Sequence, residues 1–124
     1  MQPQQRSVLI KEKASQLGFF LCGISRAEYM EEEARNLDRW LSQNYHGEMD
    51  YMVNHFDKRV DPTLLVPDAK SVISLAFNYY SEKRQSDPEA PRISTYAYGK
   101  DYHKVVRKKL NLLFDWIKST FGDV

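Results

Sequence analysis

The sequence predicts a small α+β domain in which helices cover a sheet of few strands. Apolar residues make up 42% of the 124 residues and charged residues 28%, which is ordinary for a globular domain. Two short runs of β-forming residues alternate with longer segments of helical periodicity. The length is typical of one domain rather than two, so we expect residues 1–124 to form a single domain.

The chain begins with a helix predicted over residues 6–17. Val8 and Leu9 start an apolar pattern near helical spacing, and Gly18 is a natural point for the helix to end. The run FFLCGI at residues 19–24 is rich in β-forming residues and predicts a strand.

Two helices separated by Gly47 are predicted next. The first covers residues 31–43, with Ser25 as a candidate cap before it and glutamates in its first turns. Negative charge there suits the positive end of the helix dipole. One face of this helix carries Leu37, Trp40 and Leu41. The second helix has an apolar stripe made of Met49, Met52, Val53 and Phe56.

A compact loop and a strand follow these helices. Asp61-Pro62 and Pro67-Asp68 are turn signals that bracket the loop. Residues 72–79 form a nearly continuous apolar run. Such a run predicts a strand that is buried on both faces.

The last third contains a loop, an extended segment and a long helix. Residues 81–91 are polar with two prolines and predict a loop, and residues 92–98 are expected to be extended. Residues 101–119 are amphipathic and predict a helix that Gly122 ends. The residues expected to face inward are Tyr102, Val105, Val106, Leu110, Leu113, Trp116 and Ile117.

Charge and composition exclude several classes of protein. Eighteen Lys and Arg against 17 Asp and Glu give a net charge of +1. Disordered chains combine a low apolar content with a high net charge, and this chain has neither. No apolar run approaches the roughly 18 residues of a membrane helix, and the N-terminus lacks a signal-peptide core. We therefore expect a cytoplasmic protein that does not contact a membrane.

A single cysteine, Cys22, excludes an internal disulfide and a thiolate-only metal site within this chain. Its position in an apolar strand favours a core residue over a nucleophile. We expect no metal ligands in this chain. The sequence also has no GxGxxG, P-loop or GxSxG motif.

Two short motifs surround turns in the first half of the chain. His46, Glu48 and Asp50 are metal-ligand residue types, but their spacing fits no established site. They indicate either a polar corner between helices or a contact with a ligand. Arg59 precedes the Asp61-Pro62 turn, where its fixed fork of donors suits a carboxylate, amide or phosphate. A surface ion pair is the alternative.

The most specific motif is the cluster YAYGKDYH at residues 96–103. Gly99 permits a tight turn, and Asp101 can cap the helix that follows. Capping explains Asp101 but not the aromatic residues packed around it. Such a cluster at a helix start is typical of a pocket wall for a flat ligand with polar edges.

A basic face lies on the last predicted helix. Between residues 92 and 118, seven basic residues meet only Asp101 and Asp115. A basic helix face can neutralise the phosphates of a nucleic acid, although it can also be a solvated surface. The basic residues are Arg92, Lys100, Lys104, Arg107, Lys108, Lys109 and Lys118.

Four segments together resemble a known family. They are LGFFLCGIS (17–25), the stretch from WLSQNYHGEMDYM to DKRVDPTLLVPDAKSVISLAFNYY (40–80), and STYAYGKDYHKVVRKKL (94–110). The chain is similar to the N-terminal region of epoxyqueuosine reductase, a cobalamin-dependent iron–sulfur enzyme of tRNA modification. The resemblance spans nearly the whole chain and preserves the order of the motifs.

The resemblance implies an oxidoreductase that reduces epoxyqueuosine to queuosine at the tRNA wobble position. In the family, an external donor supplies electrons that pass through two [4Fe–4S] clusters to cobalamin. It also implies a nitroreductase-like or flavin-reductase-like fold. The sheet is expected to be incomplete here, because the resemblance makes the chain an N-terminal fragment. The iron–sulfur and tRNA-binding domains are expected downstream. The chain ends before the family's cluster cysteines and proton-donating aspartate, so it contains no catalytic residue and is expected to be inactive alone.

The resemblance also implies roles for individual residues. Those expected to contact cobalamin are Arg59, Tyr96, Gly99 and Asp101. Those expected to contact the substrate are Tyr102, His103, Lys104, Arg107 and Lys108, the last three through tRNA phosphates. Two alternatives stay open: a non-catalytic RNA-binding module, and a related corrinoid or flavin reductase that acts on small molecules.

Overall fold

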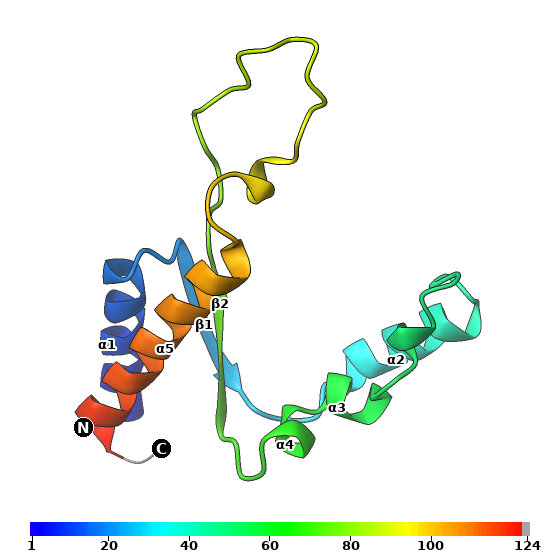
Figure 1. The fold of residues 1–124 in the computed structure, drawn as a ribbon. Coiled ribbons are helices and arrows are strands. Elements are labelled where there is room, and N and C mark those ends of the chain that lie inside the picture. Colours follow the sequence, from blue (N-terminus) through cyan, green and yellow to red (C-terminus); the bar gives the residue numbers. More distant parts are fainter. Residues whose placement is uncertain (123–124) are drawn as a thin grey trace. The chain divides into compact units, whose positions relative to one another are not determined.

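The computed structural model describes residues 1–122 and combines helices with one two-stranded sheet (Figure 1). The mixed α and β architecture expected from the sequence is confirmed. The chain divides into two units, one made of Met1–Gly23 and the segment from Ser74 onward, the other of Ile24–Ile73. The elements are α1 (Pro3–Gln16), β1 (Leu21–Arg26), α2 (Glu31–Ser42), η1 (Asp50–Met52), α3 (Phe56–Val60), α4 (Pro62–Leu65), β2 (Ser71–Ala76), η2 (Thr95–Ala97) and α5 (Tyr102–Phe121).

Strands β1 and β2 pair in an antiparallel ribbon. In the first unit, the Phe20 N–H donates to the Ala76 carbonyl at 2.7 Å, and in the second the Ala27 N–H donates to the Lys70 carbonyl at 3.0 Å. β1 begins later than predicted because the Phe19 N–H donates to the Ala14 carbonyl at the end of α1. The predicted burial of both faces of β2 is wrong. Its residues are half-buried or exposed, and none is buried.

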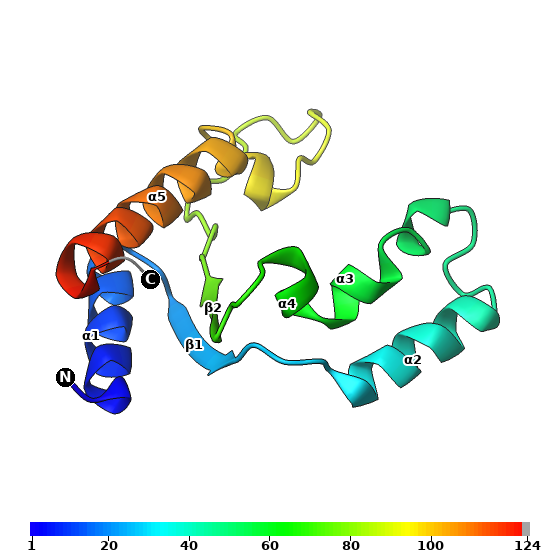
Figure 2. The same cartoon turned by 90° about the horizontal axis from the view of Figure 1, so that it is seen from below.

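Helices α1 and α5 build the core of the first unit and lie side by side in both views (Figures 1 and 2). α1 starts at Pro3, earlier than predicted, because proline is well suited to a first helical turn. Gly18 ends it with a φ of +95°, as expected. The buried side chains of this core are Ala14, Phe19, Leu113 and Ile117.

Helix α5 follows the predicted bounds closely. Asp101 caps its first turn, and Gly122 ends it with a φ of +86°. Most of the predicted inward residues are buried or half-buried. Tyr102 and Leu110 are exceptions, at 40% and 42% exposed. Their interpretation as core residues is wrong, and both side chains line a pocket described below.

In the second unit, α2 lies where the sequence predicts it. Ala34 is buried on the face that also carries half-buried Leu37 and Leu41. Ser25 does not cap this helix, because it lies within β1, and Met30 occupies the cap position. α2 packs on α3, and α3 packs on α4.

The single helix predicted after Gly47 is wrong. His55 adopts a left-handed conformation with a φ of +58°, which separates η1 from α3. The loop predicted around Asp61 also contains the short helix α4. Its start is fixed by the Asp61 carboxylate, which accepts from the Thr63 N–H at 3.0 Å and from the Thr63 hydroxyl at 2.6 Å.

The long connection between β2 and α5 is a loop at residues 81–91, as predicted. Residues 92–98 are not wholly extended, because η2 forms a turn within them. Among the described helices, none is both long enough and apolar enough to cross a bilayer.

Candidate functional site

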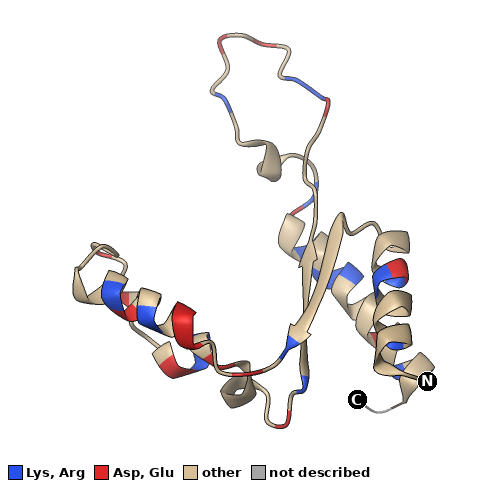
Figure 3. Cartoon of the chain, turned by 180° about the vertical axis from the view of Figure 1, so that it is seen from behind, with Lys and Arg blue, Asp and Glu red and all other residues tan. Residues whose placement is uncertain are grey.

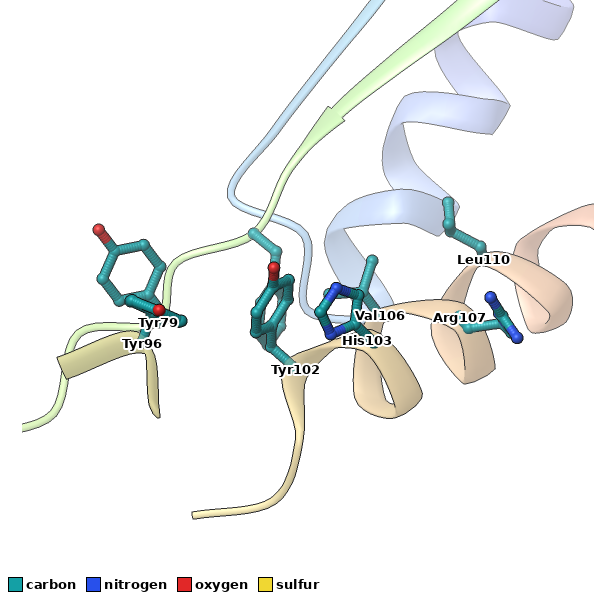
Figure 4. A pocket seen from close by; sticks show the side chains of 8 residues that line it. Tyr79, Tyr96, Tyr102, His103, Val106, Arg107 and Leu110 are labelled. Atoms are coloured by element: carbon teal, nitrogen blue, oxygen red, sulfur yellow. The ribbon is translucent and has the colours of Figure 1, made fainter. Parts of the chain in front are cut away.

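A pocket of about 620 Å³ opens in the first unit (Figure 4). One wall comes from α5, and the other from residues after the end of β2 together with η2. The side chains on the α5 wall are Tyr102, His103, Val106, Arg107 and Leu110, and those on the opposite wall are Phe77, Tyr79 and Tyr96. Of the predicted aromatic cluster, Tyr96, Tyr102 and His103 line this pocket together with Arg107, and Tyr98 does not.

The aromatic rings of the pocket contact one another in sequence. Tyr79 and Tyr96 meet edge to face with centroids 6.3 Å apart, and Tyr96 and Tyr102 do so at 5.7 Å. The Tyr102 ring stacks on His103 at 4.0 Å. All three tyrosines are at least 40% exposed. Exposed rings held by their neighbours offer apolar area at little entropic cost, which suits a large flat ligand.

Asp101 caps α5 and orients His103. Its Oδ1 accepts from the His103 backbone N–H at 3.1 Å and lies 2.9 Å from His103 Nδ1. The hydrogen bond from the His103 side chain, followed by that from the backbone N–H, lowers the pKa of the exposed Asp101 carboxyl. A carboxylate beside Nδ1 favours the proton on that nitrogen, which leaves Nε2 as an acceptor in the neutral ring.

The substitution D101N is expected to flatten the acid side of the stability profile. The folded-state pKa of Asp101 lies below the ordinary value of 3.8. Its contribution to stability is therefore present above the ordinary pKa and is lost as the pH falls through the lowered one. Asparagine still caps a helix, so the variant isolates the charge. Urea unfolding, measured from pH values above 3.8 down through the lowered pKa of Asp101, should show that the free energy of unfolding falls less on acidification in D101N than in wild type. D115N is the control, and a D101N profile that matches wild type would contradict the expectation.

Three of the predicted RNA-contacting residues lie together on the exposed side of α5. Lys104, Arg107 and Lys108 line a shallow second pocket of about 370 Å³, and Arg107 also lines the aromatic pocket. Figure 3 shows basic residues along this helix. Asp115, at the edge of the second pocket, pairs with Lys118 at 3.6 Å. This basic surface adjoins the aromatic pocket through Arg107.

Arg59 lies in the second unit and has a structural role there. Its Nε donates to the Asn54 carbonyl at 2.9 Å, and its Nη2 donates to the Tyr51 carbonyl at 3.1 Å. These bonds hold the turn between η1 and α3. Arg59 also lines a pocket of about 350 Å³ with His55, Lys58 and Leu65. The guanidinium keeps further donors for a ligand there.

Sequence reasoning and structure differ in several details of the site. Gly99, with a φ of +73°, and Asp101 shape the turn before α5 but do not line the aromatic pocket. Phe77 and Tyr79 were missed, because the sequence placed them inside the strand predicted over residues 72–79, whereas β2 ends at Ala76. Val106 and Leu110 were assigned to the core, and their spacing from Tyr102 equally predicts a pocket wall.

The polar groups around Gly47 do not assemble into a metal site. Within residues 1–122, no three His, Cys, Asp or Glu side chains are placed to hold an ion. His46 is buried against Trp40, with ring centroids 5.7 Å apart, and its Nδ1 lacks a hydrogen-bond partner. Cys22 is half-buried in β1, and burial raises the pKa of its thiol.

Comparison with known proteins gives one consistent family. The family model "Epoxyqueuosine reductase QueG, DUF1730" matches residues 59–124, just over half of the chain. The chain is 57% identical to the epoxyqueuosine reductase of Leadbetterella byssophila over 93% of its own length and 38% of that protein. It is 55% identical to that of Cellulophaga algicola, over 98% of its own length and 39% of that protein. The chain thus spans about two fifths of these relatives.

Solved structures give the same result. A crystal structure of selenomethionine-labelled epoxyqueuosine reductase matches 97% of this chain and 33% of that protein, with a TM-score of 0.74 and 32% identity. A structure of epoxyqueuosine reductase with an epoxyqueuosine-modified tRNA-Tyr stem loop matches 94% of this chain and 32% of that protein. Its TM-score is 0.76 and its identity 31%.

Proposed function

Because the chain belongs to the epoxyqueuosine reductase family, we propose that it is the N-terminal part of an enzyme that reduces epoxyqueuosine to queuosine in tRNA. The aromatic pocket beside the basic surface of α5 is the observation that carries this proposal. An enzyme that reduces a tRNA base through a bound cofactor needs a pocket for that cofactor close to cations that can hold the backbone phosphates. One related enzyme has been solved with a modified tRNA stem loop, which supports tRNA as the partner of this chain.

We propose cobalamin as the ligand of the aromatic pocket. The residues present fit such a group: the exposed rings of Tyr96 and Tyr102 can pack on part of a corrin plane, and Arg107 can donate to its amide fringe. His103, oriented by Asp101, offers an acceptor at the same edge. When bound, cobalamin supplies the reducing electrons. The pocket volume of about 620 Å³ suits one face or edge of the ring rather than its enclosure.

The remaining expectations of the proposal concern the intact protein. The two [4Fe–4S] clusters would need thiolate ligands that this chain, with Cys22 alone, does not supply. An external donor would reduce those clusters. A nitroreductase-like fold for the complete domain is supported by the mixed α and β architecture of this part. A cytoplasmic location is proposed because the substrate is a tRNA.

The proposal predicts that Y102A weakens cobalamin binding. Tyr102 contacts both Tyr96 and His103, so its loss removes ring area and frees both neighbours. We expect the Kd for cob(II)alamin, followed by absorbance titration, to rise about tenfold or more.

Y80A is the matched control for this titration, because Tyr80 is exposed and close in sequence but does not line the pocket. It should bind as wild type does. If neither the chain nor the intact protein binds cob(II)alamin below roughly millimolar concentration, the cofactor proposal is wrong.

A non-catalytic RNA-binding module is the second candidate function, favoured by the basic surface alone. The two candidates differ in a direct assay. Reduction of epoxyqueuosine in tRNA by the intact protein supports the enzyme. Salt-sensitive RNA binding without that activity or cobalamin binding supports the module.

A further inference from the structure

Lys109 differs from the other basic residues of α5 because its side chain turns into the first unit. Its Nζ donates to the Leu17 carbonyl at 2.5 Å, across 92 positions of sequence, and the side chain is partly buried. The same ammonium lies 5.5 Å from the centroid of the Phe77 ring, within the range of a cation–π contact. Lys104, Arg107 and Lys108 are instead exposed.

The end of α1 is built to receive this ammonium. Leu17 caps the C-terminus of α1, where carbonyls carry the negative end of the helix dipole. A Cβ at position 18 would lie 2.8 Å from Lys109 Nζ. Gly18 therefore does two things: it adopts the positive φ that ends α1, and it leaves room for the lysine.

Phe77 connects this contact to the aromatic pocket. Its ring packs edge to face on buried Phe19, with centroids 6.4 Å apart. The Phe77 ring also lies beneath the Lys109 ammonium, and it lines the aromatic pocket. Phe77 directly follows Ala76, whose carbonyl accepts from the Phe20 N–H. The end of β2 is therefore held both by this backbone hydrogen bond and by the contacts of the Phe77 ring.

Lys109 therefore joins the two walls of the pocket without lining it. It is part of α5, which supplies one wall, and it contacts Phe77 of the opposite wall. We propose that Lys109 is a positioning residue that fixes the spacing of the two walls and so the affinity for a flat ligand. The identity of that ligand as cobalamin rests on the function proposed above.

Titration with cob(II)alamin tests the effect on the pocket. K109M keeps most of the apolar stem but removes the ammonium, and we expect its Kd to rise about tenfold. K118M is the matched control, because the Lys118 ammonium likewise lies over an aromatic ring, 4.5 Å from the centroid of Phe114. Neither Lys118 nor Phe114 lines the pocket. The Kd of K118M should stay within about twofold of wild type. A K109M protein that binds as K118M does would overturn the proposal.

Chemical rescue separates positioning from general loss of stability. In a C22A background, K109C is alkylated with 2-bromoethylamine, which restores an ammonium at nearly the original reach. Alkylation should restore most of the lost affinity, measured at a temperature where circular dichroism shows every variant folded. Weak binding that persists after complete alkylation would count against Lys109.

A ligand-free measurement distinguishes failure of this inference from failure of the cofactor proposal. The Phe77 ring should shift the NMR signals of the Lys109 ε-methylene protons upfield, and F77L should abolish the shift. Absence of the shift in wild type overturns the role of Lys109. A clear shift in a protein that does not bind cobalamin overturns only the proposal that cobalamin is the ligand of the pocket.

Discussion

The double substitution R107E/K108E is expected to weaken binding of a tRNA anticodon stem loop by about a hundredfold at low salt. Both side chains lie on the exposed basic surface of α5 with Lys104. Replacing them removes two cations and places two carboxylates where phosphates would pass. Because each phosphate contact releases counterions, the slope of log K against log salt should also fall by about 1.5 to 2.

Fluorescence anisotropy with a labelled stem loop, repeated across salt concentrations, measures both effects. R35E/R39E is the matched control, since it makes the same change in net charge on exposed residues of α2. Arg107 also lines the aromatic pocket, so K108E alone is included to isolate the surface. Equal loss of binding in the α2 variant would show that only net charge matters, and the assignment of this surface to RNA would be withdrawn.

Helix signals in the sequence were strong where they were local. Gly18 and Gly122 end helices because both adopt a positive φ, and the periodic apolar stripes locate α2 and α5. His55 shows the limit of this reasoning. Its left-handed conformation breaks the helix predicted after Gly47. Residues other than glycine adopt a positive φ only uncommonly, so a histidine does not predict a helix break as a glycine does.

The candidate site was predictable to the extent that its residues are neighbours in the chain. Tyr96, Tyr102 and His103 lie within one motif, and the structure places all three in one pocket. Phe77 and Tyr79 follow β2 and are distant in sequence from α5, so their contact with the α5 wall is a long-range contact that a local pattern does not encode. An amphipathic stripe also does not distinguish a core from a pocket wall, which is why Leu110 was misassigned.

Arg59 and Asp101 illustrate a different limit. Each residue type suggests ligand binding, and each has a structural partner in the fold: backbone carbonyls for Arg59, and His103 for Asp101. A residue that holds a turn or a cap can still present its remaining groups to a ligand. Their proposed roles toward cobalamin therefore depend on binding measurements on variants that keep these structural bonds.

Replacing Leu113 by alanine is expected to lower the free energy of unfolding by about 2 to 5 kcal/mol. Leu113 is 3% exposed on the inward face of α5, so truncation leaves a cavity in the small core shared with α1. Leu112, the next residue along the helix, is 48% exposed. The matched variant L112A should therefore cost no more than about 0.5 to 1 kcal/mol.

Urea unfolding followed by circular dichroism compares the two variants directly, and similar midpoints would contradict the packing described for α5. The same experiment bears on the site. Leu113 lies four residues beyond Lys109 on the helix that supplies five of the pocket's lining side chains. Loosening α5 against α1 should therefore also weaken the contact of Lys109 with Leu17, since both depend on how these helices pack. L113A is expected to lose the upfield shift of the Lys109 signals at urea concentrations where L112A retains it.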